Sequence, residues 1–137
     1  MIRSVSLTYS KEWVYRALKD PILLAGWLNI PSVSTGFGPL HLFELEDWTG
    51  NAPWKTRAFI LEDNRNERIL LEKDEVGRNE KPRLEIRLED HAEGCDLRLE
   101  WEDSYFDRFA SEVLDPKGHL RLGLLLRVET ANLSEVP

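Results

Sequence analysis

The chain has 137 residues, of which 42% are apolar and 31% charged, and its formal net charge is -7. This length suits one domain that buries a single core, and the composition is typical of soluble globular proteins. The negative charge argues against nucleic acid as a partner, because phosphate binding needs clustered lysines and arginines. We therefore interpret residues 1–137 as a single domain.

The single cysteine, Cys95, excludes an intramolecular disulfide and a metal site built from cysteines. Residues 1–7 alternate as a strand does and do not resemble the apolar segment of a signal peptide. No segment approaches the roughly 20 apolar residues that a membrane span needs. We therefore expect a cytoplasmic protein that does not insert into membranes.

The first part of the chain predicts a strand followed by two short helices. Residues 2–8 form an irregular strand pattern, and Ser10 suits an N-cap for a helix that runs to Leu18. Asp20 precedes a proline and is therefore biased away from helix. Pro21 suits the first turn of a second helix that reaches about Trp27. The prolines and glycines that follow predict a loop over residues 29–39.

The middle of the chain predicts a series of strands. Residues 40–47, 54–62 and 67–74 have strand character, and residues 63–66 have the composition of a turn. Residues 84–89 and 95–102 alternate strictly between apolar and charged side chains, as strands with one solvated face do. The short loop 91–94 joins them, so we predict a hairpin. Its apolar side includes Cys95, which we interpret as a small buried residue.

The last part of the chain is ambiguous between helix and strand. Residues 104–114 fit a short helix capped near Asp103 or Ser104, and residues 116–118 read as a break after it. Over residues 119–130 leucine recurs at every second position, which is typical of a strand. At 3.6 residues per turn a different set shares a face, namely Leu122, Leu125, Leu126, Leu133 and Val136. Short apolar runs cannot be assigned by periodicity alone. The preference of leucine for helix favours a helix.

Two stretches resemble a known family. They are Trp13-Val14-Tyr15-Arg16-Ala17-Leu18-Lys19-Asp20-Pro21 with Trp27-Leu28, and Ala58-Phe59-Ile60-Leu61-Glu62-Asp63 leading to Arg68-Ile69-Leu70-Leu71-Glu72. The chain resembles the START-like (SRPBCC) helix-grip superfamily, especially its Aha1-like branch, related to the activator of the Hsp90 ATPase. The resemblance implies an α+β fold. A curved antiparallel sheet of about six strands would surround a C-terminal helix, with two short helices after the first strand.

The resemblance also implies a cavity between the sheet and the last helix. Pockets of this kind are concave, mainly apolar and able to hold apolar ligands. Alternatively, the same residues fill a closed core without a void. We predict that this space is lined by Trp27, Phe43, Phe59, Ile69, Leu71, Ile86, Leu99, Trp101, Leu122 and Leu126.

Two tryptophans, Trp48 and Trp54, flank a turn that contains glycine, asparagine and proline. Large aromatic side chains at this place would close the mouth of the cavity or anchor a protein partner. The alternative, which we favour, is that the rings fold back and pack against the domain itself.

Candidates for catalysis are few. His41 shares a strand face with Phe43 and is the best placed of the three histidines, since His91 and His119 fall in a turn and a break. The histidines lack the spacing of metal ligands, so we expect no metal site, and we expect no cofactor. The sequence therefore favours a binding protein over an enzyme.

Three functions follow from the resemblance, which is an argument by analogy. The first is binding of a hydrophobic small molecule, such as a lipid or a polyketide. The second is a protein-interaction or co-chaperone domain of the Aha1 kind. The third is a cyclase-type enzyme that polarises a carbonyl with His41, Arg57 or Glu44. A homodimer contact through Leu124 and Val128 also remains open.

Overall fold

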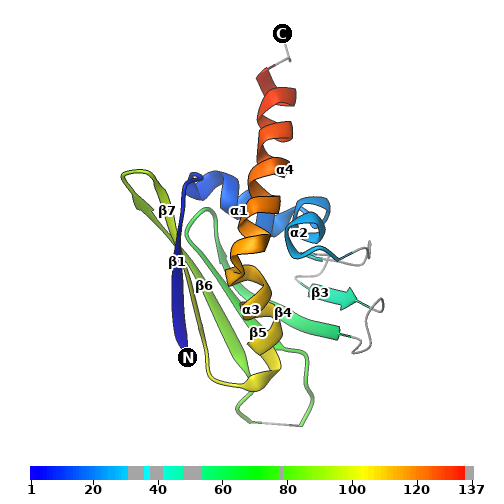
Figure 1. Ribbon diagram of the computed structural model, residues 1–137. Coiled ribbons are helices and arrows are strands. Elements are labelled where there is room, and N and C mark those ends of the chain that lie inside the picture. The colour runs from blue at the N-terminus through cyan, green and yellow to red at the C-terminus, as the bar shows by residue number, and fades with distance from the viewer. Residues whose placement is uncertain (31–35, 38–41, 48–53, 78, 135–137) are drawn as a thin grey trace.

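One curved antiparallel sheet, covered on one side by helices, makes up the domain (Figure 1). The computed structural model describes residues 1–30, 36–37, 42–47, 54–77 and 79–134. Within these residues the strand order is β1-β7-β6-β5-β4-β3-β2. The strands are β1 (Ile2–Leu7), β2 (Gly36–Phe37), β3 (Leu42–Asp47), β4 (Trp54–Asn64), β5 (Arg68–Lys73), β6 (Arg83–His91) and β7 (Gly94–Trp101).

The helices occur where the helix-grip fold places them. They are α1 (Lys11–Lys19), α2 (Pro21–Leu28), α3 (Asp107–Leu114) and α4 (Pro116–Ser134), with a 3₁₀ turn, η2 (Ser104–Phe106), before α3. This arrangement confirms the predicted α+β class, the two short helices after the first strand and the helical C-terminal segment. It adds the two-residue strand β2, which lies inside the predicted loop.

Local capping determines where α1 and α2 begin. The side chain of Ser10 accepts a hydrogen bond from the backbone N–H of Trp13 (3.4 Å). Asp20 accepts from the N–H groups of Ile22 (2.9 Å) and Leu23 (3.3 Å), with Pro21 in the first turn of α2. Since both caps satisfy N–H groups that a helix leaves free, the chain folds into two helices with a sharp joint.

The β6–β7 hairpin has the predicted register. Leu84, Ile86 and Leu88 of β6 are buried, and so are Cys95, Leu97, Leu99 and Trp101 of β7. The intervening charged residues lie on the opposite side of the sheet, which we call the outer face. The buried side, which we call the inner face, is the one that the helices cover.

A β-bulge in β4 changes which side chains face inward. Before the bulge Ile60 pairs with Leu71, whereas after it Glu62 pairs with Leu70, so Leu61 is an extra residue. The shift turns Asp63 toward α1, where it accepts a hydrogen bond from the Tyr15 hydroxyl (2.6 Å). The pKa of Tyr15 is raised above its ordinary value, mainly by burial of the hydroxyl and secondly by this hydrogen bond.

Asp63 also forms an ion pair with Lys19 of α1. The predicted turn at 63–66 is therefore corrected, because β4 continues to Asn64. The tight part of the turn contains Asn66, whose φ of 65° is left-handed. Asparagine tolerates this conformation better than most residues do.

The junction between α3 and α4 corrects the predicted break at 116–118. Asp115 accepts a hydrogen bond from the backbone N–H of Lys117 (3.0 Å), and Pro116 is the first residue of α4. This is the same Asp-Pro joint that starts α2. Gly118 belongs to the first turn of α4. A Cβ at this position would lie 3.1 Å from Cδ1 of Trp27, so glycine lets α4 approach α2 closely.

The far half of α4 stands clear of the sheet in Figure 1. Leu122 and Leu126 are buried, whereas Leu124 and Val128 are 63% and 60% exposed. A strand would have placed all four on one face, so the burial follows the helical period. Among the described helices, none combines the length and the apolar character that crossing a bilayer requires.

Candidate functional site

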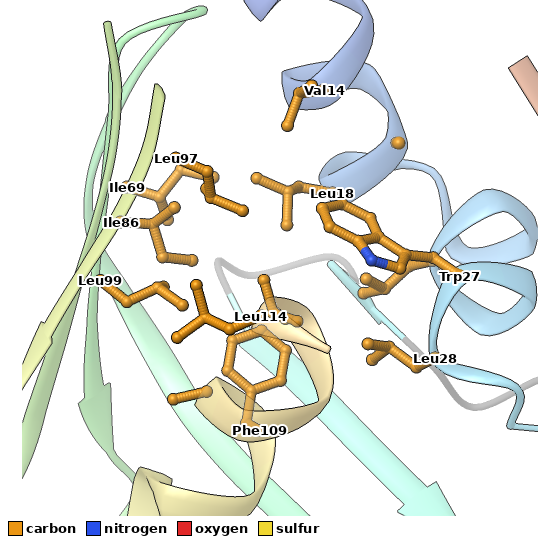
Figure 2. Close-up of a cluster of buried hydrophobic side chains, with 14 of the residues drawn as sticks. Val14, Leu18, Trp27, Leu28, Ile69, Ile86, Leu97, Leu99, Phe109 and Leu114 are labelled. Atoms are coloured by element: carbon orange, nitrogen blue, oxygen red, sulfur yellow. The ribbon is translucent and has the colours of Figure 1, made fainter. Parts of the chain in front are cut away.

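The candidate site is the inner face of the sheet together with the helical side chains that meet it. Figure 2 shows Ile69, Ile86, Leu97 and Leu99 of the sheet opposite Val14 and Leu18 of α1, Trp27 and Leu28 of α2, and Phe109 and Leu114. These residues belong to one continuous buried cluster. Among the described residues, Thr56 is the one buried residue of polar type, so this space is almost wholly apolar.

Nine of the ten predicted lining residues lie in this cluster, and none of the nine is more than 5% exposed. They come from α2, from β3, β5, β6 and β7, and from α4. The nine are Trp27, Phe43, Ile69, Leu71, Ile86, Leu99, Trp101, Leu122 and Leu126. The fold therefore gathers side chains that are up to 99 positions apart in the sequence.

Phe59 is the exception. It is 41% exposed and lies on the outer face of β4, while its neighbours Ala58 and Ile60 face inward. Side chains alternate between the two faces of a strand, and Trp54 and Thr56 of β4 point inward. Phe59 is an odd number of residues from both, so it points outward. Its predicted place in the lining is therefore corrected, because the pleat of β4 turns Phe59 toward solvent.

The side chains of η2 and α3 complete the site, although the sequence analysis did not include them in the lining. Phe106, Phe109, Ala110 and Val113 are buried with at most 1% exposure. The Phe109 ring meets Phe43 of β3 edge to face, with ring centroids 5.3 Å apart. Their i, i+3, i+4 and i+7 spacing already puts them on one side of the predicted helix 104–114, and an apolar side of this kind is the signal for a place in the lining.

Trp54 lies at the start of β4 and packs back against the domain, as the favoured alternative predicted. It is 7% exposed, and its indole Nε1 donates to Thr56 Oγ1 (3.0 Å). The guanidinium of Arg108 on α3 lies 4.9 Å from the centroid of its ring. Trp48, the other residue assigned to the cavity mouth, is outside the described residues.

The described candidates for catalysis do not converge on the inner face. Glu44 and Arg57 form an ion pair (3.2 Å) on the outer face, and Arg57 also pairs with Asp74 (3.0 Å). His119 belongs to α4 rather than to a break, and its Nε2 lies 2.9 Å from the Val113 carbonyl oxygen. His91 ends β6, where its Nδ1 accepts from the N–H of Glu93 (3.1 Å). His41 is outside the described residues.

Metal chemistry has no candidate ligands in the described part of the chain, where no group of three or more His, Cys, Asp or Glu residues could hold an ion. Cys95 is fully buried in the core, and this burial raises the pKa of its thiol to about 11. A thiol with so high a pKa is a poor nucleophile at neutral pH. Cys95 is therefore a packing residue.

Two surface grooves are lined by charged side chains and do not suit an apolar ligand. One of about 640 Å³ lies between α1 and the β4–β5 turn, where it includes Trp13, Arg16 and Arg65. The other, of about 960 Å³, lies beside Trp101 and includes the carboxylates of Glu80 and Glu102. The inner face is therefore the better candidate for an apolar ligand.

Comparison with known proteins identifies the family. The sequence profile described as activator of Hsp90 ATPase homolog 1-like protein matches residues 8–119. The chain belongs to this Aha1-like family. Among curated proteins, none matches the sequence.

Solved structures show the same Aha1-like fold. A crystal structure from Rhodobacter sphaeroides has a TM-score of 0.67 at 18% identity and covers 91% of both chains. An AHSA1-like protein from Aeromonas hydrophila has a TM-score of 0.61 at 14% identity, covering 100% of this chain and 96% of its own. The Aha1 dimer from Colwellia psychrerythraea has a TM-score of 0.57 at 14% identity and covers 91% of both chains. At these identities the likeness concerns the fold alone.

Proposed function

We propose that this Aha1-like domain binds a hydrophobic small molecule, such as a lipid or a polyketide, between the sheet and the helices that cover it. The observation that carries the proposal is the almost wholly apolar inner face, to which the sheet and all four helices contribute. Apolar ligands bind in concave spaces of this composition, in which a few polar groups provide orientation.

The ligand would enter by displacing helices rather than by filling a void between fixed walls. The inner side chains pack against one another, and interiors of this kind hold few voids of ligand size. The joint at Asp115 and Pro116 separates α3 from α4 and gives α4 a place at which to turn. The buried leucines of α4, Leu122 and Leu126, would then exchange their contacts for contacts with the ligand.

Native mass spectrometry tests the proposal on protein purified from its own host. We expect a retained apolar compound as a mass increment that organic solvent removes. In thermal denaturation, a ligand at 100 times its Kd should stabilise the fold by about 2.7 kcal/mol, or roughly 10 °C in Tm.

Two variants locate the binding site. Leu71→Phe adds volume on the inner face and should reduce the ligand-induced shift in Tm, whereas Phe59→Ala on the outer face should leave it unchanged. The proposal is contradicted if no compound is retained and a panel of lipids and aromatic polyketides leaves Tm unchanged.

A protein-interaction role of the Aha1 kind is the second candidate, and α4 favours it. Leu120, Leu124 and Val128 recur every four residues and are 74%, 63% and 60% exposed. Exposed apolar side chains that lie together often mark interaction sites. We propose that this stripe pairs with a second copy of the chain, in line with the dimer of the Colwellia protein.

Sedimentation velocity over a range of protein concentrations tests self-association. We expect the wild type to dimerise as its concentration rises and Leu124→Arg to remain monomeric, because an arginine at the centre of the stripe would be buried without a partner. Arg127→Ala, a change beside the stripe, is the matched control and should still dimerise. A wild type that stays monomeric at all concentrations would exclude this interface.

A further inference from the structure

Trp27 carries a buried hydrogen-bond donor that has no acceptor. The side chain is fully buried, and its indole Nε1 has no hydrogen-bond partner in the described part of the chain. The other two tryptophans that are buried in the described part of the chain are satisfied, since Trp54 donates to Thr56 (3.0 Å) and Trp101 donates to Asp107 (2.7 Å). A buried indole N–H normally finds a partner, because leaving it unpaired is unfavourable.

The unpaired nitrogen lies at the edge of the candidate site. A Cβ built on Gly118 of α4 would be 3.1 Å from Cδ1 and 3.3 Å from Nε1 of Trp27. The pyrrole edge of the indole therefore faces the first turn of α4, next to the joint with α3. Figure 2 shows the ring beside Leu18, with its nitrogen on the edge that faces Leu28 and Leu114.

The surroundings of Trp27 do not suit a charged acceptor. None of the described core residues is ionisable except Cys95, and the hydroxyl of Thr56 already accepts from Trp54. Arg121 contacts Trp27 from the half-buried part of α4, and its Nε donates to the Trp27 carbonyl oxygen (3.0 Å). None of the described buried residues is itself a cation, so a carboxylate within the cluster would be desolvated without a buried ion-pair partner, which is strongly unfavourable.

We infer that the indole N–H of Trp27 holds the neutral carbonyl-type oxygen of the hydrophobic ligand. The ligand class is then an apolar ketone, ester, lactone or amide rather than a hydrocarbon or a fatty-acid anion. This inference rests on the proposed function, and it adds the one polar contact that orients the ligand.

Three probes of similar shape test the inference: 2-acetylnaphthalene, 2-ethylnaphthalene and 2-naphthoate. The first carries a neutral carbonyl, the second lacks an acceptor and the third is an anion. The wild type should bind the acetyl compound about fivefold more tightly than the ethyl compound, as one net hydrogen bond provides. The naphthoate should bind more weakly than both.

Nuclear magnetic resonance of protein labelled with ¹⁵N-tryptophan reports on the indole directly in the wild type. The Trp27 proton signal should move downfield with 2-acetylnaphthalene and not with 2-ethylnaphthalene. Trp27→Phe assigns that signal and should bind the two neutral probes equally. Trp13→Phe, a tryptophan change in the charged groove beside α1 and outside the predicted lining, should keep the fivefold preference.

The outcomes separate this inference from the proposed function. Equal binding of both neutral probes to the wild type, with an unchanged Trp27 signal, would mean that the N–H is bound to a buried water, and only the inference about Trp27 would fail. If the naphthoate bound more tightly than the acetyl compound, the claim that the acceptor is a neutral oxygen would be wrong. If none of the three probes binds, the inference about Trp27 fails. The proposed function is then tested separately by the change in Tm that the panel of lipids and polyketides produces.

Discussion

Phe109→Ala is expected to lower the free energy of unfolding by about 3–5 kcal/mol, as the loss of a fully buried phenylalanine does. Phe109 is 1% exposed, and its ring meets Phe43 at a centroid distance of 5.3 Å and an interplanar angle of 67°. The truncation removes this contact and leaves a cavity between α3 and the sheet. Urea denaturation followed by circular dichroism measures the change.

Phe59→Ala is the matched control for that prediction. The same truncation at a side chain that is 41% exposed on the outer face should cost less than about 1 kcal/mol. A loss at Phe59 as large as that at Phe109 would mean that the outer face of β4 is covered, contrary to its place in the sheet.

The parts of the fold that the sequence predicts well are those in which local signals agree. The β6–β7 hairpin alternates strictly, and its two-residue connection leaves little freedom in register. The joint between α1 and α2 depends on one aspartate and one proline, whose capping contacts are local. In each case the decisive contacts are close in sequence, so no tertiary information is needed.

The position of the bulge in β4 cannot be predicted from the sequence pattern of that strand. Residues 54–62 predict a strand, yet nothing in them marks Leu61 as the extra residue, because its position depends on the pairing with β5 and on Asp63 reaching α1. Phe59 is one of the residues predicted to line the cavity, whereas the pleat that begins at Trp54 turns it outward. The register with neighbouring strands decides both cases.

The candidate site likewise has features that the sequence predicts and features that it does not. Its apolar character and nine of its residues could be predicted, since burial follows from the alternation in strands and the helical spacing. The unpaired N–H of Trp27 could not be predicted, because a missing partner is a property of the packed helices α2 and α4. His41 and Trp48, two of the predicted residues, lie outside the described part of the chain and stay predictions.

The second large effect on stability is expected at the leucines of α4, of which the helical period buries some and exposes others. Leu122→Ala should lower the free energy of unfolding by about 2–5 kcal/mol, since Leu122 is fully buried. Leu124→Ala should change it by less than about 0.5 kcal/mol, because that side chain is 63% exposed. Both values come from urea denaturation at a protein concentration at which the wild type is monomeric.

This pair of variants distinguishes a helix from a strand. Two residues apart on a strand, Leu122 and Leu124 would share one face and lose similar free energies, whereas on a helix they lie about 200° apart. Equal losses at both positions would therefore contradict α4 and, with it, the inner face that depends on Leu122 and Leu126. A large loss at Leu122 alone supports the helix as the element that closes the proposed ligand site.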